Sequence, residues 1–378
     1  MGFLHRTWAE IDSSALLHNF KIIREKAGLS KIMAVVKANA YGHSAPDIAP
    51  LLDKAGADSF AVSNLDEALQ LRGLGIKKPI LILGYTPVEA TELLCKNKIS
   101  QCIFSYEYAK ELSKAVTLLG KQLNIHIKLD TGMCRLGFNC KDDKLSELDE
   151  AIRAAGLPGF HLEGVFTHFA FSDRVEMQDN GFTNQQFDLF KKSAEAFIKS
   201  GHKPDYCHCC NSAALLLDRE KRLDLVRPGI ILYGLTPNAD LELKEELLPV
   251  MTLKSAVSMV KEISRGDTVS YGRTFKAKRK MKIATVTAGY ADGYPRLLSN
   301  KGYVLINGQK APIVGRICMD QFNADVSEIK DVKTGDEVIL FGKELPVEEI
   351  APLCDTINYE IVCGINSRVP RIMVDCDE

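Results

Sequence analysis

The sequence predicts an α/β protein built as a (β/α)8 TIM-like barrel followed by a smaller, mainly β C-terminal domain. Within residues 1–236, short apolar runs alternate with helical segments eight times, a rhythm that suits a closed barrel. Beyond residue 236, helical patterns become scarce, and turn signals such as Asn-Gly and Thr-Gly-Asp separate short strand-like runs. We therefore expect a barrel domain over residues 1–236 and a mainly β domain over residues 237–378.

The elements of the first domain follow one another at regular intervals. We expect a strand over 7–11, which packs either within this domain or on the β domain, and a helix from Asp12 to about Lys26. The apolar runs predict eight strands over 32–37, 60–63, 80–83, 101–104, 125–130, 162–168, 206–210 and 225–227. Helical patterns fall at 45–55, 65–74, 107–119, 143–155 and 183–200. A doubly wound open sheet shares this alternation, but no glycine-rich fingerprint follows the first apolar run, which favours the barrel.

The second domain begins after Thr236-Pro-Asn-Ala-Asp240, which reads as a linker. Its expected strands are 252–260, 268–271, 282–287, 302–306, 311–314, 323–326 and 337–341. We expect this domain to cover the carboxyl face of the barrel or to pair with another copy of the chain.

Composition excludes several classes of partner. The 378 residues are 46% hydrophobic and 26% charged, as in ordinary globular proteins, and the net charge of −1 offers no basic footprint for nucleic acid or for a membrane surface. The eleven cysteines are an odd number scattered through a long chain, which favours reduced thiols and a cytoplasmic location.

Lys37 is the first candidate for chemistry. It ends the apolar run 32–36, which predicts a strand buried on both faces. A lysine in that position is poorly solvated, so its neutral amine is favoured and is available to form a Schiff base. Tyr41 and Gly42 follow in a turn that offers a phenol and backbone amides to an anion. The plain alternative is a strand-end lysine that reaches solvent.

Other polar residues are expected at the same edge, because the carboxyl ends of all barrel strands meet there. They are Lys128, Asp130, Thr131, Arg135, His168, Asn211, Ser212, Arg227, Gly229 and Ile230. The donors after strands seven and eight occupy the usual phosphate position of barrels, and a phosphate site beside a Schiff-base lysine implies pyridoxal phosphate. Taken singly, the arginines can be surface ion-pair partners, and Asn211-Ser212 can be a plain helix cap.

A metal site is not favoured. The run Cys207-His-Cys-Cys210 contains ligand types, but successive strand residues face opposite ways, which makes a poor tetrahedral cluster.

The chain resembles the alanine racemase family in motifs that span almost its whole length. Early motifs are Ala34-Val-Val-Lys-Ala-Asn-Ala-Tyr-Gly-His43, Lys128-Leu-Asp-Thr-Gly-Met-Cys-Arg-Leu-Gly-Phe138, Phe166-Thr-His-Phe-Ala170, Cys210-Asn-Ser-Ala-Ala214 and Val226-Arg-Pro-Gly-Ile-Ile-Leu-Tyr-Gly234. Later motifs are Val269-Ser-Tyr-Gly-Arg-Thr-Phe275, Ala288-Gly-Tyr-Ala-Asp-Gly-Tyr-Pro-Arg296, Val314-Gly-Arg-Ile-Cys-Met-Asp-Gln321 and Ile357-Asn-Tyr-Glu-Ile361. Ser44 and Cys134 stand where the family commonly has glycine.

The resemblance implies an enzyme that interconverts L-alanine and D-alanine on pyridoxal phosphate. It implies that Lys37 holds the cofactor and is the base for D-alanine, while Tyr271, supplied by the second subunit of a homodimer, is the base for L-alanine. The resemblance further implies that the phosphate is bound by Tyr41, Asn211, Ser212, Gly229, Ile230 and Tyr359, and that Arg227 faces the pyridine nitrogen with His168 behind it. It places Arg135 and Met319 at the substrate and Tyr290 at the entrance to the site. It also implies that Lys128 is a carbamylated lysine beside Arg135.

Three alternatives stay open within this interpretation. A non-catalytic pyridoxal-phosphate carrier of the single-barrel type would lack the second domain and Tyr271. A related barrel decarboxylase would share the lysine and the phosphate site, but not the motifs around Tyr271 and Met319. A racemase of serine or of broad specificity is the nearest rival, although Tyr359 resembles the alanine-specific pattern.

Overall fold

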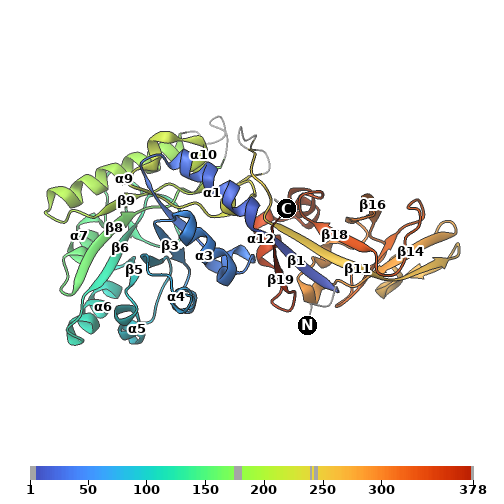
Figure 1. The fold of residues 1–378 in the computed structure, drawn as a ribbon. Helices are drawn as coiled ribbons and strands as arrows, with labels where there is room; N and C mark the ends of the chain where they lie inside the picture. The colour runs from blue at the N-terminus through green and yellow to red at the C-terminus, as the bar shows by residue number, and fades with distance from the viewer. Residues whose placement is uncertain (1–5, 174–180, 239–240, 242–245, 376–378) are drawn as a thin grey trace.

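The computed structural model describes residues 6–173, 181–238, 241 and 246–375, which form two domains lying side by side (Figure 1). One is a nearly closed barrel of parallel strands. Its order is β10 (Leu225–Val226), β2 (Lys31–Val35), β3 (Ser59–Val62), β4 (Ile80–Ile82), β5 (Ile99–Ile103), β6 (Leu123–Asp130), β8 (Phe160–Phe166) and β9 (Tyr206–His208), with β7 (Phe138–Asn139) beside β6. Between the segments that follow β9 and β10, the Arg227 amide donates to the Cys210 carbonyl at 3.0 Å, which draws the ends of the ring together.

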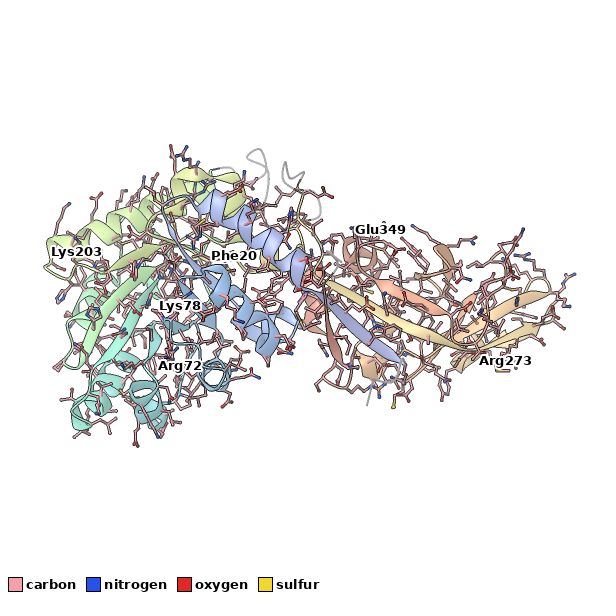
Figure 2. All side chains as sticks on the ribbon, viewed as in Figure 1. Phe20, Arg72, Lys78, Lys203, Arg273 and Glu349 are labelled. Atoms are coloured by element: carbon pink, nitrogen blue, oxygen red, sulfur yellow. The ribbon has the colours of Figure 1, made fainter. Side chains whose placement is uncertain are left out.

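Helices cover the outside of this barrel. They are α1 (Ser13–Ala27), α3 (Ala45–Ala55), α4 (Leu65–Gly73), α5 (Thr91–Lys96), α6 (Tyr106–Leu118), α7 (Leu148–Ala155), α9 (Phe182–Lys199) and α10 (Ser212–Leu217). Their starts follow from the sequence: Asn64 and Ser105 accept the Glu67 and Tyr108 amides as N-caps. Apolar side chains such as Phe20 of α1 fill the space between helices and strands (Figure 2). Among the described residues, no helix is both long enough and apolar enough to cross a membrane.

The second domain is mainly β, as the sequence predicts. Its sheet follows the order β16 (Gln309–Pro312), β15 (Tyr303–Ile306), β18 (Glu337–Phe341), β11 (Met251–Ile263), β1 (Thr7–Asp12) and β19 (Arg371–Val374), while β14 (Met281–Val286) joins β11 to β17 (Phe322–Asp325). A separate short ribbon pairs β12 (Thr268–Val269) with β13 (Phe275–Lys276). The first strand of the chain therefore lies in this sheet, antiparallel to β11 and parallel to β19, and α1 leads from it to the barrel.

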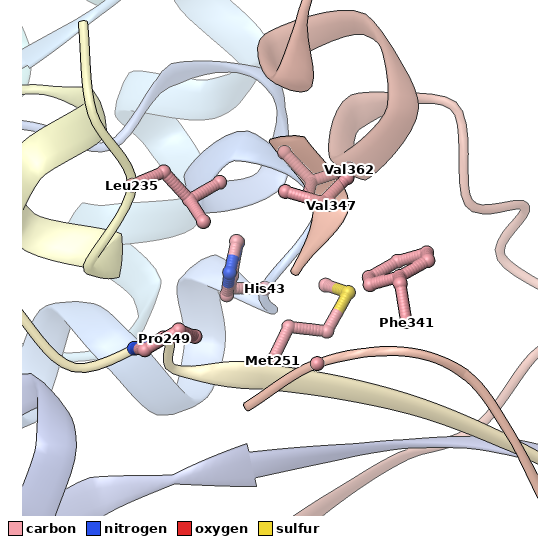
Figure 3. A pocket seen from close by; sticks show the side chains of 8 residues that line it. His43, Leu235, Pro249, Met251, Phe341, Val347 and Val362 are labelled. Carbon is pink, nitrogen blue, oxygen red and sulfur yellow. The ribbon is translucent and has the colours of Figure 1, made fainter. Parts of the chain in front are cut away.

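The hydrophobic core is continuous across the junction of the two domains. There, Met251 and Phe341 of the β domain and Leu235 share a small cavity of about 10 Å³ with His43 of the barrel (Figure 3). The Nδ1 atom of His43 lies 2.9 Å from the Tyr41 carbonyl, and its ring stacks on Tyr233 at 4.5 Å. The turn after β2 is thereby held against both domains.

Several elements are shifted or shortened relative to the sequence prediction. Strand β8 keeps its predicted length but lies two residues earlier, ending at Phe166, while β9 ends at His208 rather than at Cys210. Helix α7 begins at Leu148 rather than near residue 143, and the Glu147 carboxylate instead accepts the Asn139 amide at 2.8 Å. Strand β12 ends at Val269, because Ser270 adopts a left-handed φ of 64°. Residues 239 and 240 of the predicted linker lie outside the described residues.

Candidate active site

A cavity of about 1030 Å³ opens at the carboxyl ends of the barrel strands. It brings together eleven of the residues that sequence analysis singles out: Lys37, Tyr41, Lys128, Arg135, His168, Asn211, Ser212, Arg227, Gly229, Ile230 and Tyr359. The barrel topology explains this convergence, because every parallel strand delivers its carboxyl end to the same mouth.

Lys37 lies where β2 ends and the segment α2 (Lys37–Tyr41) begins. Burial, followed by the positive charge of Arg135, lowers the pKa of the Lys37 ammonium below its ordinary value, which favours the neutral amine. This side chain therefore meets the electrostatic requirement for a nucleophilic or basic lysine.

The α2 segment is a left-handed turn, not a right-handed helix. Residues 38–41 have φ between 52° and 55°, a conformation that costs an L-residue about 1–2 kcal/mol. The turn is retained because its backbone is bonded: the Ala38 amide donates to Glu67 Oε1 at 2.7 Å, and the Gly42 amide donates to the Ala38 carbonyl at 2.9 Å. Lys37 and Tyr41 consequently face one cavity from the two ends of a tightly held segment.

A cup of neutral donors forms beside Lys37. The Gly229 amide donates to Ser212 Oγ at 2.9 Å, and Asn211 caps α10 by accepting the Ala214 amide at 3.0 Å. Burial, with a further contribution from the neighbouring Tyr359, raises the pKa of Tyr41, so its phenol remains a neutral donor. Hydroxyl and amide donors of this kind, near the strands that commonly bind phosphate in barrels, suit a phosphate group.

Arg227 is buried in the lining of the cavity, where three acceptors lie within 3.2 Å of its guanidinium. Its guanidinium donates to His208 Nδ1 at 2.7 Å, to the Thr167 carbonyl at 2.8 Å and to the Cys209 carbonyl at 3.2 Å. Burial lowers the pKa of Arg227 to about 10, which leaves the group protonated at neutral pH.

The imidazole nearest to Arg227 is that of His208, which sequence analysis missed as a site residue. His168, expected behind Arg227, lies farther away, with Nδ1 3.5 Å from Nη2. Burial, and next the Arg227 charge, lower the pKa of both histidines well below the ordinary value, so both rings are neutral. The only sequence signal for His208 is that it lies on a predicted barrel strand.

Lys128 lies inside the barrel mouth, and only 5% of it is exposed. Its ammonium donates to the Leu129 carbonyl at 2.8 Å and lies 5.5 Å from the Phe166 ring centroid. Burial lowers its pKa to about 8, so a substantial fraction of the amine is neutral near that pH. Arg135 lies beyond it on an exposed loop, directly after Cys134, whose φ is 54°.

Asp130 and Thr131, expected at the same edge, do not line this cavity, and neither do three residues that the family resemblance places at the site. Tyr271, Met319 and Tyr290 are exposed on the β domain, with Tyr271 72% accessible. The segments that carry Met319 and Tyr290 are joined, because the Tyr290 amide donates to the Cys318 carbonyl at 3.1 Å and the Ala291 amide donates to the Met319 carbonyl at 3.0 Å.

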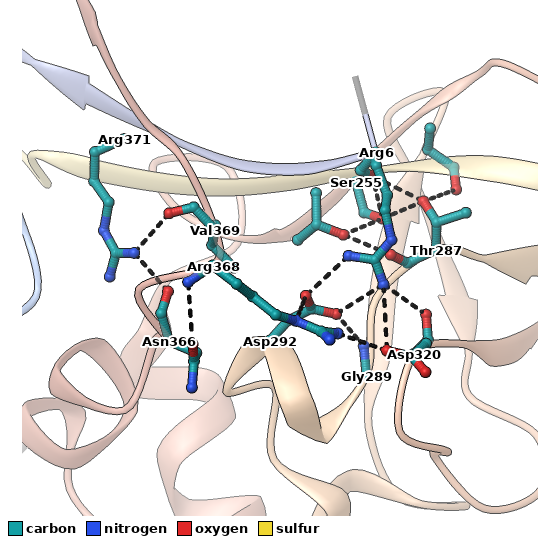
Figure 4. Close-up of polar contacts among 12 residues, drawn as sticks. Arg6, Ser255, Thr287, Gly289, Asp292, Asp320, Asn366, Arg368, Val369 and Arg371 are labelled. Atoms are coloured by element: carbon teal, nitrogen blue, oxygen red, sulfur yellow. Dashed lines mark hydrogen bonds and ion pairs between the residues drawn. The ribbon is translucent and has the colours of Figure 1, made fainter. Parts of the chain in front are cut away.

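A buried carboxylate braces these segments, and sequence analysis did not identify it. Asp292 is fully buried and pairs with Arg6 at 2.9 Å and Arg368 at 2.7 Å, while Arg368 also binds Asp320 at 2.8 Å (Figure 4). The Gly289 amide also donates to Asp292, at 2.9 Å. This cluster ties the segment that carries Tyr290 and the segment that carries Met319 to Arg6 and Arg368.

The residues present fit pyridoxal phosphate. Lys37 can take an aldehyde, the cup formed by Tyr41, Ser212 and Gly229 can take a phosphate, and Arg227 presents a fixed cation to the ring between them. In the described part of the chain, no three His, Cys, Asp or Glu side chains gather in a way that suits a metal ion.

Comparisons with known proteins agree with this geometry. The family model described as "Alanine racemase, N-terminal domain" matches residues 11–237, and "Alanine racemase, C-terminal domain" matches residues 250–373. The alanine racemase of Desulforamulus reducens is 44% identical over 370 residues, covering 97% of this chain and 98% of that protein. An alanine racemase of Clostridium perfringens is 46% identical over 370 residues, covering 97% of this chain and 94% of that one.

Solved structures give the same result in three dimensions. The alanine racemase of Clostridium difficile 630 superposes with a TM-score of 0.92 at 40% identity, covering 100% of this chain and 98% of that one. The alanine racemase of Bacillus anthracis with bound L-Ala-P has a TM-score of 0.92 at 36% identity, covering 100% of this chain and 97% of that one.

Proposed function

The chain belongs to the alanine racemase family, and from this premise we propose that it interconverts L-alanine and D-alanine with two bases, Lys37 and Tyr271, on opposite faces of the substrate. The observation that carries the proposal is the convergence of Lys37, Arg227 and the Ser212–Gly229 cup in one cavity. When bound there, pyridoxal phosphate supplies an electron sink that acidifies the α C–H bond of an amino acid.

Two bases explain why a lysine and a tyrosine are both needed. Racemisation removes a proton from one face of the α carbon and returns a proton to the other face, and a single base would have to swing between them. Lys37 serves the D-alanine face, supported by the lowered pKa of its ammonium. Tyr271 serves the L-alanine face.

Tyr271 reaches the cavity from a second copy of the chain in this proposal. Support comes from its exposure on the β domain, together with that of Met319 and Tyr290, while Lys37 lies in the barrel cavity. The functional unit is then a homodimer with composite sites. Met319 contacts the substrate and Tyr290 lines the entrance, both contributed by the partner copy.

The remaining residues bind and orient. Tyr41, Ser212, Gly229, Ile230 and Tyr359 hold the phosphate, and Asn211 supports Ser212 at the start of α10. Arg227 donates a hydrogen bond towards the pyridine nitrogen and keeps its proton, because guanidinium stays protonated at neutral pH. His168 lies beside it.

Arg135 and Lys128 act at the substrate end of the cavity. Arg135 binds the substrate carboxylate and the phenolic oxygen of the cofactor. The Lys128 amine adds carbon dioxide, losing a proton to form a carbamate that buttresses Arg135. The proposal is supported by the burial of Lys128 and its pKa of about 8, since only a neutral amine reacts in this way.

We place this activity in the bacterial cytoplasm, where D-alanine serves the cell wall. The ten cysteines of the described part are free thiols, which suits a reducing compartment, and the proteins compared above come from bacteria.

The test is α-proton exchange of L-alanine in D₂O by the cofactor-loaded enzyme, followed by NMR and chiral analysis. We expect exchange accompanied by D-alanine. Exchange without inversion would contradict the two-base assignment, and release of carbon dioxide would favour a decarboxylase. L-serine, tested in parallel, distinguishes an alanine-selective enzyme from a racemase of broad specificity.

A further inference from the structure

A hydrogen-bonded relay of four side chains runs from the active-site cavity through the barrel interior to its opposite end. The relay consists of Arg227, His208, His126 and Glu163. Arg227 Nη1 lies 2.7 Å from His208 Nδ1, and His208 Nε2 lies 2.9 Å from His126 Nδ1. His126 Nε2 then lies 3.0 Å from Glu163 Oε2. All four residues are at least nine-tenths buried, and His126 and Glu163 line another cavity, of about 140 Å³.

The charges at the two ends determine the direction of every hydrogen bond. Arg227 only donates, so His208 must accept through Nδ1 and carry its single proton on Nε2. His208 then donates to His126 Nδ1, which leaves the His126 proton on Nε2, facing the Glu163 carboxylate. One tautomer of each ring therefore satisfies every hydrogen bond of the relay. The relay links a buried cation, Arg227, to a buried anion, Glu163.

The backbone is adapted to this arrangement. The β6–β8 ladder pairs Ile125 with Leu162 and His126 with Gly164, so Glu163 is the extra residue of a β-bulge. Neighbouring strand residues normally face opposite ways, yet Glu163 and Gly164 both lie against His126. Because a Cβ at residue 164 would lie 2.2 Å from His126 Nδ1, only glycine leaves room for the atom that contacts His208.

Other contacts hold the two ends of the chain. Ser100 Oγ donates to Glu163 Oε2 at 2.5 Å, and Asn124 Nδ2 donates to Oε1 at 3.0 Å. The hydrogen bond from His126, followed by those from Ser100 and Asn124, lowers the pKa of Glu163 despite its burial and keeps it ionised. Phe166 stacks on His208 at 4.9 Å with parallel rings, which fixes the plane of that imidazole.

We propose that Glu163 and His126 are positioning residues for Arg227: the carboxylate favours the same tautomers of His126 and His208 that Arg227 requires, so that the His208 acceptor is held in place for the guanidinium. The plane and charge of Arg227 are thereby held from the far end of the barrel. This inference rests on the proposed role of Arg227 at the pyridine nitrogen. Outer residues that orient an inner ligand in this way commonly change activity 10- to 100-fold when replaced.

The test uses cofactor-loaded enzyme labelled with ¹⁵N in its histidine rings. In the wild type we expect His126 and His208 to be neutral and protonated on Nε2. In Glu163→Leu, which removes the acceptor at His126 Nε2, we expect both rings to populate the Nδ1-protonated tautomer as well, with the Arg227 guanidinium displaced from His208 whenever they do. For the same variant we expect kcat to fall about 10-fold with a smaller change in KM, because positioning in the transition state is lost.

A second variant keeps the test decisive if Glu163→Leu does not fold. Glu163→Gln retains an acceptor oxygen but removes the charge, and we expect it to weaken the His126 Nε2–H bond and move the ring signals of His208, which Glu163 does not contact. Unmoved His208 signals, or a wild-type His208 protonated on Nδ1, would overturn the proposal.

The matched control is Asp205→Asn. Asp205 pairs with His161 at 2.8 Å near the same end of the barrel, but both side chains are exposed and the pair lies outside the relay. We expect this variant to leave kcat and the His208 signals unchanged. The histidine NMR signals are recorded without turnover, so they test the relay independently of activity. A wild-type enzyme that does not racemise alanine would therefore overturn the proposed function without counting against the relay.

Discussion

The hydroxyl of Tyr41 lies so close to Gly229 that a Cβ added at residue 229 would be 2.7 Å from it. This separation is shorter than real Cβ contacts allow, so glycine is required for the phenol to reach the cup formed with Ser212. The closeness of two residues almost 190 positions apart defines the proposed phosphate site.

Replacing Gly229 with alanine should therefore displace the Tyr41 phenol and weaken cofactor binding. We expect the dissociation constant for pyridoxal phosphate to rise about 10-fold, the equivalent of one lost hydrogen bond to a charged group. Titration of the apoenzyme, followed by absorbance, measures it. Gly73→Ala is the control, because a Cβ there meets nothing within 4 Å; equal effects of both substitutions would contradict the steric argument.

The buried Lys128 should make stability depend on pH in a predictable direction. Its pKa is about 8 when folded, against an ordinary value of 10.5. Between these values the unfolded chain binds more protons than the folded chain, so the free energy of unfolding rises with pH across this window. The full rise is about 3 kcal/mol for this group alone.

Lys128→Met isolates this contribution from other groups that titrate in the same range. Denaturant unfolding from pH 7 to 11, in buffer free of carbon dioxide, should show the wild type gaining stability relative to Lys128→Met as pH rises. A difference in the free energy of unfolding that stays constant across this pH range would show that the pKa of Lys128 is not lowered in the folded protein. Added bicarbonate should flatten the dependence if the amine is carbamylated.

Lys37, Ser212, Arg227 and Gly229 can be predicted as neighbours from the sequence, because each follows an apolar run whose end must lie at the barrel mouth. The relay through Glu163 cannot be predicted in this way. Its side chain faces His126 only because of a β-bulge, which period-two patterning does not reveal.

Long-range pairing hides other features from the sequence. Residues 38–41 contain no glycine, so four consecutive left-handed residues become stable only through support from partners such as Glu67. The place of β1 in the second sheet depends on pairing with β11, more than two hundred residues away. The roles of Tyr271 and Met319 come only from the family resemblance, since both residues are exposed on this chain.

Cys134 offers a test of backbone strain beside the site. Its φ of 54° favours glycine, the residue common at this position in the family, and its amide donates to Asp130 Oδ1 at 2.9 Å. We expect Cys134→Gly to raise the free energy of unfolding by about 0.5 kcal/mol, because relief of strain exceeds the added entropy of the unfolded chain. Chemical denaturation measures it. Cys134→Ala removes the thiol but keeps the Cβ, so an equal gain there would refute the strain explanation.

The composite site predicts complementation between two inactive variants. Lys37→Ala removes the base in the barrel, and Tyr271→Phe removes the base on the β domain, so each homodimer should lose at least about 1000-fold in kcat. If Tyr271 serves the cavity of the partner, a mixed dimer contains one site with both bases intact. Random assortment then restores about a quarter of wild-type activity, since half of the dimers are mixed and each has one working site.

The measurement is racemase activity after the two variants are unfolded and refolded together. The control mixes Lys37→Ala with a Lys37→Ala, Tyr271→Phe double variant, which can form no intact site. Recovery of activity in the first mixture alone would establish that the two bases act across the dimer. Absence of recovery, with mixed dimers demonstrated by mass spectrometry, would mean that Tyr271 does not act in the partner's cavity.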